Sequence, residues 1–579
     1  MDKNKTLKRL FSYIKKYKMH VVFSIITAIL GNVLVIIGPY IVGKGIDKIV
    51  GKGQVDFNAV LKIIIVVAAL YVTSAVFQWG LQVLTSIIAN RTIEDIRSDA
   101  FEKLTRMPLK FYDDNAHGEI MTRLTNDLEF VSEGLYQGIT QFVSGIVAIV
   151  GSLIFMAVLS PAITMVVVLM TPVCFKIASF ITKSSNRLFK EQSKTIGELN
   201  GYIEEIIGNQ KIVKAFGYEE RSQEKFNEIN QRLYKCGRWA QFYSSLVNPS
   251  TRLVNNITYI LLGITGGLSA IAGRLTIGNI SSFLTYSTQF SQPINNITSV
   301  ATQLQAAIAS AERVFKILDK EEEMPESEDL ITLSSTNGKV SFNNVSFSYS
   351  KERPLIKNFN LKVESGSRIA IVGPTGAGKT TLVNLLMRFY EVDNGKIFVD
   401  DIDIKTVTKD SVRKSFGMVL QDTWLFSGTI RDNISYGKPE ATEEEIIAAA
   451  KAANAHSFIK RLHRGYDTLI TEGGGNLSQG QKQLLTIARV MLALPSMLIL
   501  DEATSSVDTR TEANIQKAFD KMMKGRTSFI IAHRLSTIKE ADLILVLNNG
   551  QIVEQGNHEE LLQRKGFYSK LYYSQYEGQ

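Results

Sequence analysis

A glycine-rich segment of the sequence has the residues and the spacing of a phosphate-binding loop. It follows the apolar segment Arg368–Val372 and reads Gly373-Pro374-Thr375-Gly376-Ala377-Gly378-Lys379-Thr380-Thr381. Glycines let consecutive backbone N–H groups converge on phosphate oxygens, and the helix expected after the loop adds its positive end. Lys379 would bring a positive charge to the outer phosphates, and the Thr380 hydroxyl would ligate Mg²⁺. The segment therefore predicts a site for a nucleoside triphosphate.

Three further residues could complete such a site. Asp501 and Glu502 follow the apolar segment MLIL, and a carboxylate at a strand end can hold the Mg²⁺ shell. The second carboxylate of the pair could polarise the attacking water. His533 follows another apolar segment, SFIIA. An acidic strand end or a lone histidine is often only structural. The functional interpretation of these residues therefore depends on their occurring in the same chain as the loop.

The composition of the whole chain averages two unlike halves. With 579 residues the chain is too long for one hydrophobic core, and its two cysteines exclude a disulfide framework or a cysteine-rich metal site. The mean hydropathy of +0.04 is neutral. The net charge of +9 indicates an anionic partner, but the first 18 residues alone contribute +6 of it. That cluster suits a membrane surface, so nucleic acid is not needed to explain the charge.

Six mostly uncharged segments in the N-terminal half are each close to the length of a bilayer core, about 20 residues. In order they are Val21–Val42, Ile63–Ala89, Phe142–Ser160, Ala162–Thr182, Leu253–Gly273 and Ile277–Val300. One such run could be a buried core helix, but six in series predict membrane spans. The basic N-terminus predicts that this end is cytoplasmic, and an even number of spans returns the C-terminus to the same side.

The links after the second and fourth spans are long and have helical periodicity. A helix running unbroken from about Ala59 to Arg106 would be about 70 Å long and would project from the bilayer. Pro108 ends it, and Gly217 breaks the second link. Each link therefore predicts two long helices joined by a short crosspiece, near residues 108–116 and 212–219, which could dock on a soluble domain.

These features divide the chain into three parts. Residues 1–319 form the predicted transmembrane domain, and the acidic, polar stretch 320–338 is a predicted linker. Residues 339–579 alternate short β-branched strands with helical stretches, which is typical of an α/β domain with a mainly parallel sheet.

The motifs of the C-terminal part resemble, in order and spacing, those of the ATP-binding-cassette (ABC) transporters. The similar type is the exporter that fuses six spans to one nucleotide-binding domain. The resemblance rests on the phosphate loop, the aromatic Tyr349, Gln421 of a Q-loop, Thr471–Gly474 of an X-loop, the signature Leu477-Ser478-Gln479-Gly480-Gln481, Ser506 and Asp508 of a D-loop, and His533. It covers essentially the whole chain.

The resemblance implies ATP and Mg²⁺ as ligands and a role for each matched residue. Tyr349 would stack on the base and Lys379 would hold the phosphates, while Thr380 and Gln421 would coordinate Mg²⁺ with Asp501 in its outer shell. Glu502 would act as general base or orient water, and His533 would contact the γ-phosphate. The signature residues Ser478 and Gly480 would complete the site of a second half-transporter.

Two departures from the family pattern bear on the partner. Gln479 stands where the usual residue is glycine, and the D-loop reads SSVD where SALD is commoner. Gln479 adds bulk beside the partner's nucleotide, so that site is expected to be slow, whereas this chain's own site is complete. The asymmetry resembles one subunit of the heterodimeric bacterial multidrug exporters. The alternative is a homodimer that tolerates the glutamine.

The last two spans carry many polar side chains. Because polar groups are costly against lipid, Arg252, Asn255, Asn256, Tyr286, Gln289 and Asn295 are candidates for a substrate cavity. Hydrogen bonds between helices would account for some of them. No ring of acidic or basic residues marks a charged substrate.

The function expected from all this is ATP-driven export of amphipathic small molecules across the bacterial cytoplasmic membrane. A homodimeric lipid flippase and a non-transporting membrane-bound ATPase are the alternatives.

Overall fold

The computed structural model describes residues 3–49, 55–323, 330–333, 336–350, 354–421, 423–501, 508–531 and 535–576. The chain forms two compact units, each described by itself. The first comprises Met1–Arg106 and Ala116–Lys320, and the second comprises Met107–Asn115 and Glu321–Gln579.

The first unit consists of helices within its described part. They are α1 (Lys3–Lys15), α2 (Lys18–Asp47), α3 (Phe57–Thr105), α5 (His117–Leu124), α6 (Asn126–Leu159), α7 (Pro161–Gly208), α8 (Gln210–Ala215), α9 (Glu219–Ser245), α10 (Val247–Ile271) and α11 (Ile277–Leu318). The expected unbroken helix after residue 59 is present, since α3 has 49 residues. Only Ser160 separates α6 from α7.

Five helical stretches among the described residues are long and apolar enough to cross a membrane. They are Lys18–Asp47, Phe57–Thr105, His117–Leu159, Pro161–Gly208 and Glu219–Ile271. They cover the first five predicted spans, except for Ser160 at the end of the third and residues 272–273 at the end of the fifth. The sixth predicted span lies in α11, which is a helix of 42 residues but more polar than those five.

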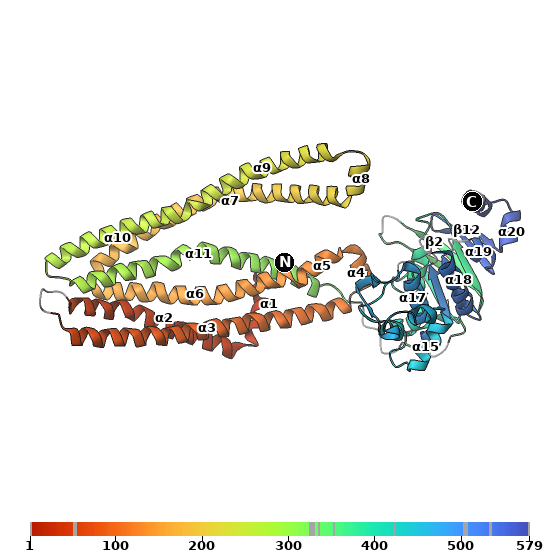
Figure 1. Cartoon of the computed structure of the whole chain (residues 1–579), viewed down its shortest axis with the longest axis horizontal. Helices are drawn as coiled ribbons and strands as arrows, with labels where there is room; N and C mark the ends of the chain where they lie inside the picture. The colour runs from red at the N-terminus through yellow and green to blue at the C-terminus, as the bar shows by residue number, and fades with distance from the viewer. Residues whose placement is uncertain are drawn as a thin grey trace. The chain divides into compact units, whose positions relative to one another are not determined.

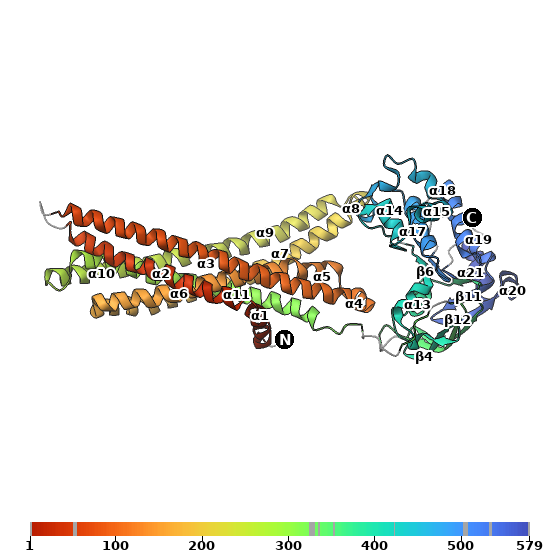
Figure 2. The ribbon, with the colours of Figure 1, turned by 90° about the horizontal axis from the view of Figure 1, so that it is seen from below.

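Two groups of helices make up this unit. Helices α2, α3, α6 and α11 run side by side, and α7 runs beside α9 with the short α8 at their common tip (Figures 1 and 2). Small residues allow α6 and α11 to approach closely, because a Cβ at Gly134 of α6 would lie 2.3 Å from the Cβ of Ala307 of α11. The same pair of helices is joined by the buried carboxylate of Asp127, which accepts from Arg313 Nε at 2.9 Å.

The second unit is an α/β domain with two main sheets. Its strands are β1 (Val340–Phe347), β2 (Ile356–Val363), β3 (Arg368–Val372), β4 (Asn394–Val399), β5 (Ile402–Asp403), β6 (Phe416–Val419), β7 (Gly428–Thr429), β8 (Leu469–Ile470), β9 (Met497–Asp501), β10 (Thr527–Ile531), β11 (Leu543–Asn548) and β12 (Gln551–Gly556). The order β2-β1-β4-β5 forms an antiparallel sheet. The order β12-β11-β3-β10-β9-β6 forms the predicted mainly parallel sheet, with β12 antiparallel at one edge.

The helices of this unit surround these sheets. They are α4 (Leu109–Asp114), α12 (Lys379–Leu386), α13 (Lys409–Ser415), α14 (Ile430–Ser435), α15 (Glu443–Ala452), α16 (His456–Ile459), α17 (Gln479–Ala493), α18 (Thr509–Met523), α19 (Leu535–Lys539), α20 (His558–Gln563) and α21 (Phe567–Tyr576).

The parallel sheet is buried on both faces. In β3, Ile369 and Ile371 belong to one apolar cluster, while Ala370 and Val372 belong to another. Alternate residues of a strand point to opposite faces, so both faces are covered. This explains why the strand sequences are continuously apolar, and it leaves the strand ends as the places where polar groups can lie.

Candidate nucleotide-binding site

The strand order brings the predicted site residues to one edge of the parallel sheet. Strands β3, β10, β9 and β6 are parallel neighbours, so their carboxyl ends lie at the same edge. Their register is level, because Ile531 pairs with both Ile371 and Asp501. The phosphate loop, Asp501 and Gln421 therefore follow strand ends at the same height, although they are far apart in sequence.

Backbone conformation explains the glycines of the phosphate loop. Gly376 and Gly378 have φ of 81° and 100°, a region that L side chains rarely adopt. At Gly373 a Cβ would lie 2.2 Å from the carbonyl oxygen of Leu547, so no side chain fits there. Gly378 immediately precedes α12 and leaves the first N–H groups of that helix free of a side-chain cap. Uncapped N–H groups of this kind can form a concave donor surface for phosphate.

Lys379 lies over this loop. Its Nζ donates to the carbonyl oxygens of Gly373 at 2.7 Å and Pro374 at 3.0 Å. Burial lowers the pKa of Lys379, and the negative charge of Asp501 opposes that shift. A half-buried ammonium held by only two carbonyl oxygens gains from a phosphate anion. Lys379 thus fits the expected role of binding the outer phosphates.

The residues present also fit Mg²⁺. Thr380 and Gln421 are exposed, and Asp501 is partly exposed. The oxygen atoms of these three side chains, near the carboxyl edge of the sheet, are therefore open to a cation. Among the residues that the structure describes, no three His, Cys, Asp or Glu side chains form a metal cluster. Mg²⁺ needs none, because it is usually held by one or two protein oxygens together with phosphates.

Tyr349 is fixed beside α12. Its hydroxyl donates to Thr381 at 3.3 Å and accepts from Asn384 Nδ2 at 3.2 Å. Its ring contacts Phe347 and Tyr390 edge to face, with both centroids 4.9 Å away. Tyr349 as a whole remains 41% exposed, so it offers surface to a base. Thr381, predicted to bind ATP, is itself buried under this contact.

Tyr390 connects this aromatic group to the first predicted crosspiece. Its hydroxyl donates to the carboxylate of Asp113 in α4. Burial and this hydrogen bond raise the pKa of Tyr390, so the phenol remains a donor at physiological pH. No sequence motif pointed to Tyr390, because its partner is 277 residues away.

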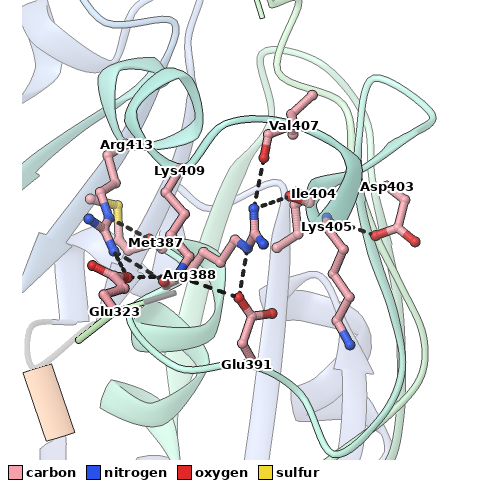
Figure 3. A network of polar contacts seen from close by, with 10 residues as sticks. All are labelled: Glu323, Met387, Arg388, Glu391, Asp403, Ile404, Lys405, Val407, Lys409 and Arg413. Carbon is pink, nitrogen blue, oxygen red and sulfur yellow. Dashed lines mark hydrogen bonds and ion pairs between the residues drawn. The ribbon is translucent and has the colours of Figure 1, made fainter. Parts of the chain in front are cut away.

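A polar network fixes the end of α12 to the first residues after α11 (Figure 3). Glu323 accepts from Lys409 at 2.8 Å and from Arg413 at 3.0 Å. Arg388, which ends this helical segment with φ of 51°, donates to the carbonyl oxygens of Ile404 and Val407. Arg413 also donates to the carbonyl oxygens of Met387 at 3.4 Å and Arg388 at 3.3 Å. Glu323, part of the stretch predicted as a linker, is therefore connected through α13 to the end of α12.

The signature motif begins a helix and has a complete cap. Ser478 Oγ accepts from the Gln481 backbone N–H, and Gln481 Oε1 accepts from the Ser478 backbone N–H. Leu477 and Gly480 are buried, while Ser478 and Gln479 are exposed. The Gln479 amide donates to Thr423 Oγ1 at 3.3 Å, only two residues beyond Gln421. The side chain that replaces glycine is thus tied to the Q-loop segment.

Several predicted site residues lie outside the described residues, namely Glu502, Ser506 and His533. Asp508 is described, and its carboxylate caps α18 by accepting from the Thr511 backbone N–H at 3.0 Å. In the X-loop, Gly473 and Gly474 both have positive φ, and Lys482 donates to the Gly473 carbonyl oxygen at 2.7 Å.

Comparison with known proteins decides the family. The model of the ABC transporter transmembrane region matches residues 21–294, and the ABC transporter model matches residues 356–505. The ABC transporter ATP-binding protein YfiC of Bacillus subtilis is 43% identical over 577 residues, covering 100% of this chain and 95% of the relative. This chain belongs to the ABC transporter family.

Other relatives of this ABC transporter carry more specific names. The fatty acid ABC transporter ATP-binding/permease protein of Mycobacterium bovis is 45% identical over 91% of this chain and 83% of its own length. The putative multidrug export protein YgaD of Bacillus subtilis is 34% identical over 98% of both chains. A solved bacterial Atm1-family ABC exporter with ATP bound has a TM-score of 0.77 and 29% identity, covering 96% of this chain and 98% of its own.

Together these findings describe a half-transporter of the exporter type. The transmembrane region is fused to an ATPase domain that binds ATP with Mg²⁺ and couples hydrolysis to transport. The fold implies a multi-pass membrane protein that works as a dimer.

The predicted cavity residues of this transporter lie in different environments. Tyr286 is fully buried, and its hydroxyl donates to the carbonyl oxygen of Ile36 at 2.7 Å, a bond between helices. Arg252 and Asn256 are exposed on α10, and Asn255 lines a small cavity with Thr258. Gln289 lines a larger cavity between α2, α6 and α11. The side chain of Asn295 lies outside the described part.

Proposed function

We propose that this ABC exporter moves amphipathic small molecules out across the bacterial cytoplasmic membrane. The observation that carries the proposal is a cavity of about 520 Å³ in the helical unit, lined mainly by apolar side chains with a few amides. A volume of this size suits a drug-sized ligand. The multidrug-export name of one relative supports the same class of cargo. Both ends of the chain are proposed to be cytoplasmic, as the basic N-terminus predicts.

We further propose that the chain is one half of a heterodimer with one competent and one degenerate ATP site. Its own site has the phosphate loop, Asp501 and Glu502 in order. Its signature motif, which would serve the partner's site, carries Gln479 bound to Thr423 instead of a glycine. A side chain held there reduces the room beside the partner's nucleotide and restrains the Q-loop segment. Slow turnover at the partner's site follows.

Within the proposal, each residue of this chain's site has a task. Lys379 and the loop N–H groups bind the outer phosphates, and Tyr349 stacks on the base. Thr380, Gln421 and Asp501 would hold Mg²⁺, which supplies charge neutralisation of the phosphates when bound. These assignments rest on the level strand ends and on the half-buried ammonium of Lys379.

The two remaining tasks concern hydrolysis itself. Glu502 orients the attacking water and takes its proton, and His533 contacts the γ-phosphate. On the partner's nucleotide, Ser478 and Gly480 act through the N-terminus of α17, whose backbone N–H groups favour an anion.

Coupling to the spans would run through the first crosspiece. Tyr390 contacts Tyr349 on one side and hydrogen-bonds Asp113 of α4 on the other. Since α4 follows α3 in the chain, a shift of the base-binding tyrosine is passed to a spanning helix.

Inverted membrane vesicles provide the test. A fluorescent neutral amphiphile should accumulate in vesicles that contain this chain and a second half-transporter, only when ATP and Mg²⁺ are added. Glu502→Gln should bind ATP but abolish accumulation. Absence of ATP-dependent accumulation over a panel of amphiphiles would refute the export proposal. Full ATPase and transport rates from the chain alone would refute the heterodimer and favour a homodimer.

A lipid-like cargo is the second candidate. It is favoured by the 45% identity to a protein named as a fatty acid transporter. It shares the fold and the ATP site with the first candidate and differs only in the cargo. Flipping of a fluorescent phospholipid between the leaflets of the same vesicles, without efflux of soluble amphiphiles, would select it.

A further inference from the structure

The cavity between α2, α6 and α11 is polar without being charged. Its polar part comes from Asn32, Gln141, Ser144, Gln289, Gln292 and Asn296. The rest of its described lining is aliphatic except for Phe142 and Pro293, and no acidic, basic or histidine side chain belongs to it. The three helices come from distant parts of the sequence, so the cavity exists only in the folded unit.

The amides of this cavity have acceptors left over. Asn32 Nδ2 donates to the Ala28 carbonyl oxygen at 2.7 Å and to Ser144 Oγ at 3.2 Å. Because a carbonyl oxygen can only accept, the orientation of this amide is fixed, and both of its N–H donors are used. Its Oδ1 has no donor among the described residues.

Two glutamines leave acceptors in the same way. Gln141 Nε2 donates to Gln137 Oε1 at 2.8 Å, so Gln141 keeps its own carbonyl oxygen. Gln289 Oε1 is buried and has no hydrogen-bond partner in the described structure. A buried acceptor without a donor is unfavourable, so it favours a ligand that donates to it.

The charge of the ligand follows from the same surroundings. A carboxylate can accept from amide N–H groups, but it has no proton to donate to the unpaired Gln289 Oε1, and the described lining has no cation to balance its charge. A quaternary ammonium has no N–H group to donate. It would also lose its hydration on entering the cavity without meeting an anionic side chain among the described lining residues. A neutral N–H or O–H group has neither disadvantage.

We propose that this cavity binds an uncharged amphiphile whose N–H or O–H group donates to Gln289 and the neighbouring amide carbonyl oxygens. The apolar remainder of the lining receives the hydrocarbon part of the ligand. The inference rests on the proposed export function and assigns its substrate class. It separates this chain from its relative named for fatty acids, whose cargo ends in a carboxylate.

Matched probes test the preference for a neutral donor. Binding of dodecanamide, dodecanoate, methyl dodecanoate and dodecyltrimethylammonium is measured with the full transporter in lipid nanodiscs at pH 8, with protein-free nanodiscs as the blank for partitioning. The amide should bind about tenfold more tightly than the other three, which corresponds to about one net hydrogen bond. Equal or tighter binding of dodecanoate or of the ammonium would overturn the proposal.

Substitutions locate the preference. Gln289→Leu should reduce binding of dodecanamide about tenfold and leave the methyl ester unchanged, since only the donor contact is lost. Gln305→Leu, on the same helix but outside the cavity lining, is the matched control and should change neither. Unchanged amide binding in Gln289→Leu would refute the role of Gln289.

A second variant covers the case in which Gln289→Leu does not fold, as judged by its ATP binding. Gln289→Glu places a carboxylate in the cavity and should strengthen binding of the ammonium probe relative to the amide. No change in that ratio would also refute the role of Gln289.

The vesicle assay keeps this inference apart from the proposed function. ATP-dependent transport with no preference among the four headgroups refutes the inference alone. A clear amide preference without any ATP-dependent transport refutes the proposed export function alone.

Discussion

The two units of this transporter place their polar groups in opposite ways. In the nucleotide unit, backbone N–H groups and the charged Lys379 and Asp501 follow the ends of parallel strands. In the helical unit, the cavity is lined by neutral amides spread over three helices. The first arrangement suits phosphate, which has the same charge and shape in every ATP-driven protein. The second suits a site where a charge without a partner is costly.

The difference explains why one site appears as a motif and the other does not. A loop that cradles phosphate needs glycine at fixed positions, because its backbone has positive φ at Gly376 and Gly378. A cavity between helices needs only suitable side chains on facing surfaces. Many sequences satisfy that condition, so the cavity has no fixed spacing.

The largest expected effect tests the charged site. Lys379→Ala should reduce the steady-state ATPase rate about 100-fold or more, because a preorganised charge on the phosphates is lost. Phosphate release by the purified transporter measures this. Lys405→Ala, an exposed lysine of the same unit, should leave the rate unchanged. An ATPase rate of Lys379→Ala within about twofold of wild type would contradict this difference between the units. An equally large loss of ATPase rate in Gln289→Leu, measured without substrate, would contradict it as well.

A smaller effect concerns the connection between the sites. Tyr390→Phe keeps the ring against Tyr349 but removes the hydrogen bond to Asp113. We expect basal ATPase within about twofold of wild type and about fivefold less transport per ATP, since one charge-assisted hydrogen bond is lost. Tyr466→Phe, whose hydroxyl lies 2.8 Å from His456 Nδ1, is the control. Unchanged coupling would show that this hydrogen bond does not transmit the signal.

The next expected effect concerns Gln479 of the signature motif and the proposed difference between the two ATP sites. Gln479→Gly frees Thr423 from its hydrogen bond and removes the side chain that we propose to lie beside the partner's nucleotide. If the proposed heterodimer is right, the transporter assembled with its second half should hydrolyse ATP about two- to threefold faster, a barrier change of about 0.5 kcal/mol. The cap formed by Ser478 and Gln481 is untouched by this change, so the helix start is retained. A rate equal to wild type would mean that Gln479 does not limit that site.

The smallest effect concerns the fixed end of the linker. Burial alone would raise the pKa of Glu323, but the hydrogen bond from Lys409 and the charge of Arg413 outweigh it, so the pKa is lowered. A lowered folded-state pKa gives stability above the unfolded pKa of about 4.3, and this stability is lost as pH falls through the folded pKa.

Glu323→Gln should therefore lower the unfolding temperature of the nucleotide unit by about 2 °C at pH 7, with the difference disappearing below about pH 4. Differential scanning fluorimetry of the full chain over a pH series measures this. Glu440→Gln, an exposed carboxylate with no ion pair in the described structure, is the control. A difference that is independent of pH would contradict the charge-based explanation.

Local rules accounted for much of the fold before the structure was known. Helical periodicity, interrupted by Pro108, predicted the long helix that α3 forms. The helix after the glycine-rich loop and the mainly parallel sheet were also predicted correctly. Each depends on residues close together in sequence, where steric and hydrogen-bonding preferences act directly. The roles of Glu502, Ser506 and His533 stay predictions, since these residues lie outside the described structure.

Contacts between distant residues could not be predicted in this way. The bonds of Tyr390 to Asp113 and of Gln479 to Thr423 belong to no motif. Tyr286 and Gln289 are three residues apart on α11, and both were candidates for the cavity. The first bonds the backbone of α2, and the second lines the cavity. Only the packing of α2 and α6 against α11 separates these two environments.

The sequence by itself determined the chemistry of the ATP site, because glycine conformation and the charges of lysine and carboxylate are properties of the residues. The tertiary structure decided which of these residues meet. It inserted β10 between β3 and β9 and brought Asp501 level with the phosphate loop. It also decided the cavity of the helical unit, because a space between helices depends on how their side chains pack, and packing is settled only when the distant segments come together.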